Sequence, residues 1–176
     1  TPHVFNWLAS TEAGGIAMTP LLTDDDHRWQ QLIPDRVVEI VDDDGRPLPP
    51  GEVGRVRIGN DGGPASYLND EEASRRFFAD DFFYPGDLAV TRADGRLALR
   101  GRVTDVINVR GRKILPVIIE DRLADILGVT GVCLFSMQSD DGEENVHVVI
   151  EAPNPLPAAK LRPIFGQEFF GFPHVD

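Results

Sequence analysis

Gly101-Arg102-Val103-Thr104-Asp105 is the stretch at which the pattern of this 176-residue sequence changes. Before it, short apolar segments alternate with turns rich in Gly, Pro and Asp, a pattern typical of strands. After it, the apolar residues follow the order strand, helix, strand, strand. We therefore expect an α+β fold in two parts: a β-rich part over residues 1–102 and a small α+β part over residues 103–176.

The first part is expected to consist mainly of strands. Within residues 53–58, apolar side chains alternate with arginines, which indicates a strand buried on one face. Asn69 and Glu72 form a capping-box pattern that predicts a helix over residues 70–78. Asp94-Gly95 predicts a hairpin with a two-residue turn. The predicted strands are residues 36–41, 53–58, 88–90 and 97–99.

The second part is expected to open with a small hairpin, with strands over residues 103–109 and 114–115 on either side of Gly111. Pro116 fits the first position of a helix that ends before Gly128. The apolar face of this helix carries Ile119, Leu123, Ile126 and Leu127. The remaining predicted elements are strands over residues 132–135 and 146–150, joined by an acidic turn over residues 140–142, and a helix over residues 158–170, interrupted by Pro163.

The composition argues against several classes of protein. A formal net charge of −12 argues against a surface for nucleic acid or for an anionic membrane. The sequence has no apolar run long enough to predict a membrane span, and no charged-then-apolar leader that predicts secretion. Cys133 is the only cysteine and lies in an apolar run, so we expect it to be buried and unpaired, in a protein of the reducing cytoplasm.

Five cations stand out against this acidic background: Arg100, Arg102, Arg110, Arg112 and Lys113. One interpretation is a solvated strand edge, because charged side chains protect sheet edges from further pairing. The other interpretation is a site for a ligand that carries phosphates, such as ATP or coenzyme A. The residues alone leave both interpretations open.

Two short segments carry side chains that could bind a nucleotide. In Ser10-Thr11-Glu12, a hydroxyl beside a carboxylate could hold a phosphate and its Mg²⁺, which prefers oxygen ligands. The Asp87 carboxylate, directly after Gly86, could accept hydrogen bonds from both hydroxyls of a ribose. Each segment taken alone is more commonly a turn or a helix cap.

Three motifs in this order resemble those of the adenylate-forming synthetases, which include acyl-CoA ligases, adenylation domains of peptide synthetases and luciferase-like enzymes. They are Ser10 to Gly15, Tyr84 to Asp87 and Gly101 to Ile114. The resemblance runs from about Thr11 to about Ile150 and implies a C-terminal piece of such an enzyme. The sequence departs from the family pattern at Pro85, and at Leu8 and Ala9, which replace an aromatic residue and a glycine.

The resemblance implies roles for four residues near the nucleotide. Thr11 would contact the phosphate of the acyl-adenylate, and Glu12 would bind Mg²⁺. Asp87 and Arg102 would hold the ribose of ATP or AMP. Thr11 and Glu12 are therefore the candidate catalytic residues, and Asp87 and Arg102 are candidate cofactor-binding residues.

The resemblance also implies roles for the segment after the ribose motif. Thr104 takes the position of the hinge between the large domain of the family (residues 1–102) and its mobile C-terminal lid (residues 103–176). The turn at Gly111 would line the tunnel for a pantetheine arm, and Arg112 would suit phosphates. The family's glycine-rich phosphate loop and its C-terminal catalytic lysine do not occur in this sequence, so we expect this chain alone to be inactive.

We therefore expect a piece of an AMP-forming acid–thiol ligase. The intact enzyme would couple a carboxylic acid to ATP, giving an acyl-adenylate and pyrophosphate, and would then transfer the acyl group to coenzyme A. Two alternatives stay open: an adenylation domain that loads a carrier protein, and a binding module without catalysis.

Overall fold

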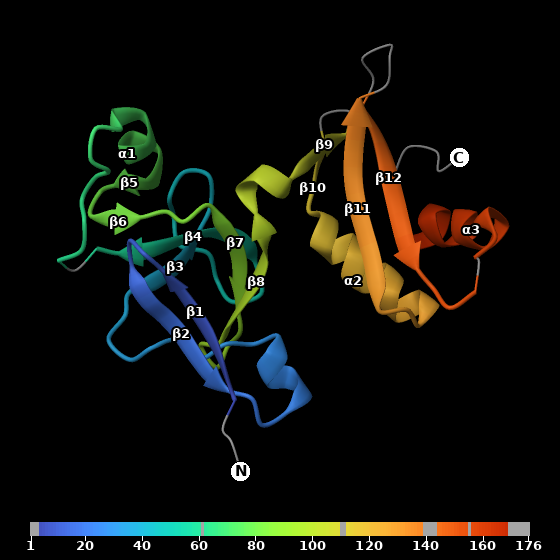
Figure 1. Ribbon diagram of the computed structural model, residues 1–176, viewed down its shortest axis with the longest axis horizontal. Helices are drawn as coiled ribbons and strands as arrows, with labels where there is room; N and C mark the ends of the chain where they lie inside the picture. The colour runs from blue at the N-terminus through green and yellow to red at the C-terminus, as the bar shows by residue number, and fades with distance from the viewer. Residues whose placement is uncertain (1–3, 61, 110–111, 139–143, 155, 169–176) are drawn as a thin grey trace. The chain divides into compact units, whose positions relative to one another are not determined.

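The computed structural model describes residues 4–60, 62–109, 112–138, 144–154 and 156–168. The chain divides into two compact units, Thr1–Thr104 and Asp105–Asp176 (Figure 1). Strands predominate over helices, and the α+β class expected from the sequence is confirmed. No helix in the described part of the chain is long and apolar enough to cross a membrane.

Unit 1 contains a six-stranded antiparallel sheet built around β4 (Val53–Gly59) (Figure 1). Strand β4 pairs with β3, β6 and β7, and β8 pairs with β7. The other strands of this sheet are β3 (Val38–Val41), β5 (Phe78–Ala79), β6 (Phe82–Phe83), β7 (Asp87–Thr91) and β8 (Leu97–Arg102). Strands β1 (Phe5–Ser10) and β2 (Gly14–Pro20) form a separate antiparallel hairpin.

The alternation expected for β4 is confirmed. Gly54, Val56 and Ile58 are buried, and the residues between them are half-buried. Val56 and Ile58 belong to a core cluster that also includes residues of β3, β6, β7 and β8. A side chain at position 54 would collide with the Val41 carbonyl, so the close approach of β3 requires glycine there. Successive side chains of a strand point to opposite faces, so Arg55 and the other arginine of β4 share the face away from this core.

The hairpin predicted around Asp94-Gly95 exists, but its loop is longer than two residues. Thr91 pairs with Leu97, and the Arg92 amide donates a hydrogen bond to the Arg96 carbonyl at 2.8 Å. Three residues therefore remain in the loop, and the last of them, Gly95, has a φ of 82°. A three-residue hairpin loop commonly ends with a glycine in the left-handed region. The dipeptide Asp94-Gly95 therefore suits a three-residue loop as well as the predicted two-residue turn.

Helix α1 (Glu71–Phe77) is not capped by the residue that the sequence pattern indicated. Asn69, the expected cap, has a φ of 58° and lies in the left-handed region, whereas an N-cap is normally extended. Asp70 caps the helix instead, because its carboxylate accepts a hydrogen bond from the Ala73 amide at 2.9 Å. The predicted N-cap is therefore one residue too early in the sequence.

Unit 2 contains two antiparallel strand pairs and two helices. Its elements are β9 (Ile107–Val109), β10 (Arg112–Ile114), α2 (Pro116–Leu127), β11 (Gly131–Gln138), β12 (Glu144–Glu151) and α3 (Ala158–Glu168). Strand β9 pairs with β10, and β11 pairs with β12. The first strand was expected from residue 103, but Val103–Asp105 form a short 3₁₀ helix, η2, and β9 begins two residues later.

The predicted bounds of α2 are confirmed, with Pro116 in its first turn and Gly128 in the left-handed region at its end (φ 64°). Leu123 of α2 is fully buried, and it packs in one cluster with Leu134 of β11 and Phe165 of α3. The Leu134 amide also donates a hydrogen bond to a carboxylate oxygen of α2 at 2.7 Å. Apolar packing and this hydrogen bond together fasten α2 to β11.

Two burial predictions for unit 2 are wrong. Ile126, expected on the buried face of α2, is 37% exposed, because it lies in the last turn of the helix, beyond the packed Leu123. Cys133 is exposed because side chains alternate along β11 and its neighbour Leu134 takes the core-facing position. Gly111 and the acidic turn at residues 140–142 lie outside the described residues.

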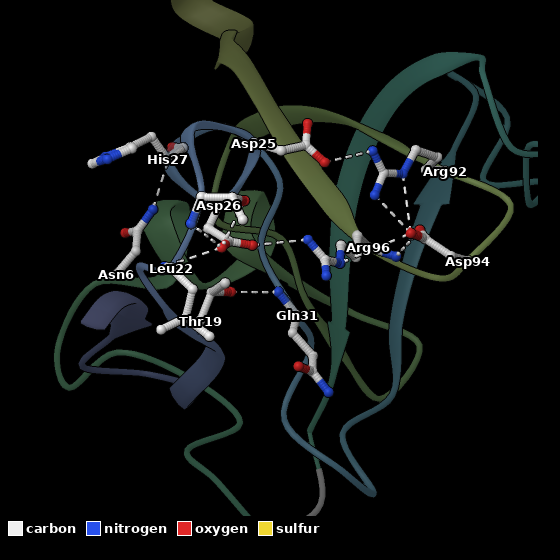
Figure 2. A network of polar contacts seen from close by, with 11 residues as sticks. Asn6, Thr19, Leu22, Asp25, Asp26, His27, Gln31, Arg92, Asp94 and Arg96 are labelled. Carbon is white, nitrogen blue, oxygen red and sulfur yellow. Dashed lines mark hydrogen bonds and ion pairs between the residues drawn. The ribbon is translucent and has the colours of Figure 1, made fainter. Parts of the chain in front are cut away.

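In unit 1, a network of charged side chains ties the segment after β2 to the β7–β8 loop (Figure 2). This segment includes a short 3₁₀ helix, η1 (Asp24–His27). The buried Asp26 carboxylate accepts hydrogen bonds from two backbone amides and from the Thr23 hydroxyl, the last at 2.9 Å. Arg96, directly after this loop, donates to the other Asp26 oxygen at 3.0 Å. These contacts, the Thr23 hydroxyl first among them, hold the pKa of Asp26 below its ordinary value.

We predict that Asp26→Asn lowers the stability of unit 1 in a pH-dependent way. Because the pKa of Asp26 is lowered in the folded protein, its contribution is complete above the unfolded-state pKa of about 3.9. The contribution is lost as the pH falls through the folded-state value. Urea midpoints, followed by the fluorescence of Trp7 and Trp29, should therefore differ between the variant and the wild type at neutral pH and converge in acid.

The neighbouring carboxylate provides the matched control for this prediction. Asp25 is exposed and pairs with Arg92 at 2.9 Å, also across to the β7–β8 loop. Exposed ion pairs contribute little to stability. Asp25→Asn should therefore shift the urea midpoint much less than Asp26→Asn, and an equal shift in the two variants would contradict the prediction.

Candidate nucleotide site

Thr11 and Glu12 lie in the tight turn that joins β1 to β2. The Ser10 hydroxyl accepts a hydrogen bond from the Ala13 amide at 3.0 Å. Gly14 has a φ of 67°, a conformation that favours glycine. Thr11 is exposed, whereas Glu12 is half-buried. The turn therefore presents a hydroxyl to solvent beside a carboxylate that is partly shielded from it.

The Glu12 carboxylate is held by a residue that is distant in the sequence. Tyr67 donates a hydrogen bond to Glu12 Oε1 at 2.6 Å, and this bond is the main reason why the pKa of Glu12 is below its usual value. Burial, together with the bond to Glu12, raises the pKa of Tyr67 to about 12. The Tyr67 ring makes edge contacts with Phe77 and Phe78. At neutral pH the pair is therefore a neutral hydroxyl, fixed by aromatic packing, that donates to an ionised carboxylate.

A cavity of about 260 Å³ lies beside Glu12, and Arg36 and the segment after β4 line it. A Cβ atom at Gly63 would collide with the Asn60 side-chain oxygen, so a larger residue there would displace that side chain. Within the described residues, no group of three or more His, Cys, Asp or Glu side chains could hold a metal ion. Glu12 therefore fits Mg²⁺ only where phosphate oxygens and waters supply the other ligands, as they commonly do beside nucleotides.

Asp87 and Arg102 lie opposite each other where the β7–β8 hairpin opens. Arg102 Nε is 3.2 Å from Asp87 Oδ1, and Arg102 Nη2 donates a hydrogen bond to the Pro85 carbonyl at 2.7 Å. The Val103 amide donates to the Gly86 carbonyl at 2.8 Å. Gly86 has a φ of 82°, which permits the bend that brings a carbonyl and a carboxylate to the same guanidinium.

This pair places a hydrogen-bond acceptor and several donors at one point of the surface. The Asp87 side chain is 23% exposed and that of Arg102 is 57% exposed, so both can reach a ligand. A ribose presents two neighbouring hydroxyls, which can donate to the carboxylate and accept from the guanidinium. The geometry therefore suits the recognition of a vicinal diol.

The structure brings together only part of the site that the sequence predicts. Asp87 contacts Arg102, but Glu12 lines the cavity of about 260 Å³, whereas Arg102 lines another of about 370 Å³. Gly111 lies outside the described residues. Of Arg112 the structure describes only the backbone, in β10 of unit 2.

Sequence reasoning missed Tyr67, Arg36 and two arginines, Arg55 and Arg76, that line the larger cavity. Tyr67 is 55 residues from Glu12, so no spacing rule within an element relates the two. Arg55 and Arg76 read as ordinary polar residues on the exposed side of a strand and a helix. No local signal in the sequence identifies them.

No protein-family model matches the chain. Pseudomonine synthase PmsE of Pseudomonas entomophila is 34% identical over 134 residues, which cover 73% of this chain and 21% of that protein. A salicylyl-CoA synthase / salicylate adenylyltransferase of Streptomyces sp is 32% identical over 124 residues, which cover 69% of this chain and 22% of that protein. Among solved structures, ATP-bound MatB from Rhodopseudomonas palustris shares the fold, with a TM-score of 0.76 at 24% identity over 93% of this chain and 34% of that one.

The chain is homologous to the adenylate-forming synthetases. These AMP-binding enzymes include acyl-CoA ligases and the adenylation domains of peptide synthetases, so the family resemblance drawn from the three motifs is confirmed. The matched region spans about a fifth of the length of the two curated relatives and about a third of the solved chain. The chain thus corresponds to one part of a synthetase of this family.

We predict that Tyr67→Phe raises the pKa of Glu12 in this synthetase homologue, because the substitution removes the hydrogen bond that lowers that pKa most. An NMR titration of the Glu12 side-chain carboxyl carbon measures the change. Tyr84→Phe, at the only other tyrosine of the chain, is the matched control and should leave the pKa of Glu12 unchanged. A Glu12 pKa that stays low in Tyr67→Phe would show that other donors hold the carboxylate.

Proposed function

We propose that this chain supplies the ribose-binding and hinge region of an AMP-forming acid–thiol ligase. The observation that carries the proposal is the Asp87–Arg102 pair, in which a carboxylate and a guanidinium lie 3.2 Å apart and both are accessible. The enzyme that contains this region would join a carboxylic acid to the α-phosphate of ATP and release pyrophosphate. It would then pass the acyl group to a thiol and release AMP.

Each proposed site residue has a task that its surroundings allow. Asp87 accepts hydrogen bonds from the ribose hydroxyls, and Arg102 donates to one of them. Thr11 donates its exposed hydroxyl to a phosphate oxygen of the adenylate. Glu12, kept ionised by the Tyr67 hydroxyl, would hold Mg²⁺ together with phosphate oxygens. The ion would offset the negative charge that develops on those oxygens.

In this proposal the two parts of the chain are the end of the large domain, residues 1–102, and the lid, residues 103–176. Compact unit 1 extends to Thr104, the proposed hinge residue. Thr104 lies in the short 3₁₀ helix η2, and 3₁₀ turns of this length are frequent as connectors between elements. Gly111 and Arg112 would reach the thiol tunnel once the lid has rotated.

We propose coenzyme A as the acceptor thiol. One relative is named for salicylyl-CoA synthesis and another as a fatty acid–acyl-carrier-protein ligase, so a carrier protein is the alternative acceptor. Arg112 and the exposed Lys113 of β10 supply cations close to the proposed tunnel turn. Free coenzyme A carries a 3′-phosphate and a pyrophosphate, which such cations attract.

Nucleotides with and without the ribose diol test the role of Asp87. We predict that the chain binds AMP on the order of 100-fold more tightly than 2′,3′-dideoxy-AMP, because two charge-assisted hydrogen bonds of about 1.5–3 kcal/mol each are lost. Asp87→Asn should remove most of this preference in calorimetric or NMR titrations. Glu52→Gln, at an exposed carboxylate, should keep it. Equal binding of the two nucleotides to the wild-type chain would refute the ribose assignment.

The acceptor is tested in the longest natural protein that includes this sequence. We predict release of AMP with free coenzyme A, and a rise in the KM for coenzyme A on Arg112→Glu that exceeds the rise in the KM for ATP. Arg162→Glu, at an exposed arginine of α3, serves as the control and should leave both constants unchanged. Turnover with a pantetheinylated carrier protein, but none with the free thiol, would favour the carrier-loading alternative.

A further inference from the structure

The larger of the two cavities described above combines arginines with aromatic rings, and two of these arginines, Arg55 and Arg76, have no role in the proposed function. Its volume is about 370 Å³, within the range of roughly 300–1,000 Å³ that is typical of ligand pockets. Three arginines line it, from β4, from α1 and from the end of β8: Arg55, Arg76 and Arg102. Asp43 is the only carboxylate among the described residues that line it.

Two aromatic side chains of the same cavity hold two of these arginines in place. The Arg55 guanidinium carbon lies 5.1 Å from the centre of the Tyr84 ring. That of Arg76 lies 5.2 Å from the centre of the Phe77 ring. A cation–π contact of this kind positions a guanidinium without cancelling its charge. Over the part of the chain that the structure describes, neither Arg55 nor Arg76 forms an ion pair with a carboxylate.

Other arginines of unit 1 do have acidic partners. Arg57, two residues further along β4, pairs with Glu39 at 2.6 Å, and Arg96 pairs with Asp26 at 3.0 Å. Carboxylates are plentiful in a chain with a net charge of −12, yet three arginines and a single carboxylate, Asp43, are found among the described residues that line this cavity. Like charges gathered in a cavity repel one another, and an anion that enters the cavity relieves this repulsion.

We propose that Arg55 and Arg76 of this cavity bind a phosphate group of a nucleotide, beside the ribose hydroxyls held by Asp87 and Arg102. Guanidinium groups bind phosphate through paired hydrogen bonds. The rings of Tyr84 and Phe77 offer apolar surface to the rest of the ligand. In the proposed ligase the group is the 3′-phosphate of coenzyme A, and only this choice of source rests on the proposed function.

A nucleotide without a vicinal diol separates this site from the ribose site. Adenosine 3′,5′-bisphosphate matches the phosphorylated end of coenzyme A, and its 3′-hydroxyl is esterified. We expect it to bind the chain and to shift the Nε–Hε resonances of Arg55 and Arg76 in an NMR titration. Arg76→Gln should weaken its binding roughly ten-fold and leave AMP binding nearly unchanged. Asp87→Asn should weaken AMP binding and spare the bisphosphate.

An arginine outside the cavity provides the matched control. The Arg46 side chain is 74% exposed and pairs with nearby aspartates. Arg46→Gln removes the same charge as Arg76→Gln, so it should leave the affinity for the bisphosphate unchanged. An equal loss in the two variants would mean that the chain attracts phosphates only through its overall charge, and would overturn the inference.

Three further ligands identify the source of the phosphate. Tighter binding of coenzyme A than of dephospho-coenzyme A, by a similar factor of roughly ten, assigns the site to the 3′-phosphate. If coenzyme A and dephospho-coenzyme A bind equally, and inorganic phosphate shifts the resonances of Arg55 and Arg76, the phosphate site stands and its ligand is free phosphate. No shift of these resonances with any of the ligands overturns the inference. Bisphosphate binding without a preference for AMP over its dideoxy analogue would instead reject the proposed function and leave this site standing.

Discussion

The antiparallel pairing of β7 with β8 is the constraint on which the candidate nucleotide site depends. Asp87 and Arg102 stand at the open end of this hairpin, where the register shifts by one residue between Asp87 and Ala89, so that Arg102 pairs with Asp87. The paired residues are Ala89 with Leu99, Val90 with Ala98, and Thr91 with Leu97. Most of these side chains are buried, so a slip of one residue would disrupt their packing. Burial therefore holds the two strands together, and the register shift at their open end places the carboxylate against the guanidinium.

Two carboxylates outside the six-stranded sheet, those of Glu12 and Asp26, are positioned by polar contacts with residues distant in the sequence. Tyr67 reaches Glu12 across 55 residues, and Arg96 reaches Asp26 across 70. Each carboxylate lies among donors that lower its pKa, so each stays ionised at neutral pH. Hydrogen bonds to an ionised carboxylate thus have two different effects. Around Asp26 they anchor a loop to the sheet, and around Glu12 they keep a candidate metal ligand charged and fixed in position.

Features that depend on neighbours in the sequence could be predicted, and features that depend on tertiary contacts could not. The bounds of α2 and the alternation in β4 follow from local patterns and are confirmed. The cap of α1 was misplaced by one residue because Asn69 and Asp70 both suit a cap, and only the backbone angle decides between them. Asp87 and Arg102 came from the family motifs, but their contact, and the reach of Tyr67 to a distant turn, required the folded chain.

Strand register also decides which arginine of β4 lies opposite a carboxylate. Arg55 and Arg57 share one face of β4, yet within the described part of the chain only Arg57 forms an ion pair with a carboxylate. The register places Glu39 of β3 opposite Arg57. Opposite Arg55 the same sheet places Val41 and Leu88, which are apolar and buried. The strand pairing therefore places apolar residues, and no carboxylate, directly opposite Arg55. The charged Arg55 side chain instead lines the cavity beside the candidate ribose site.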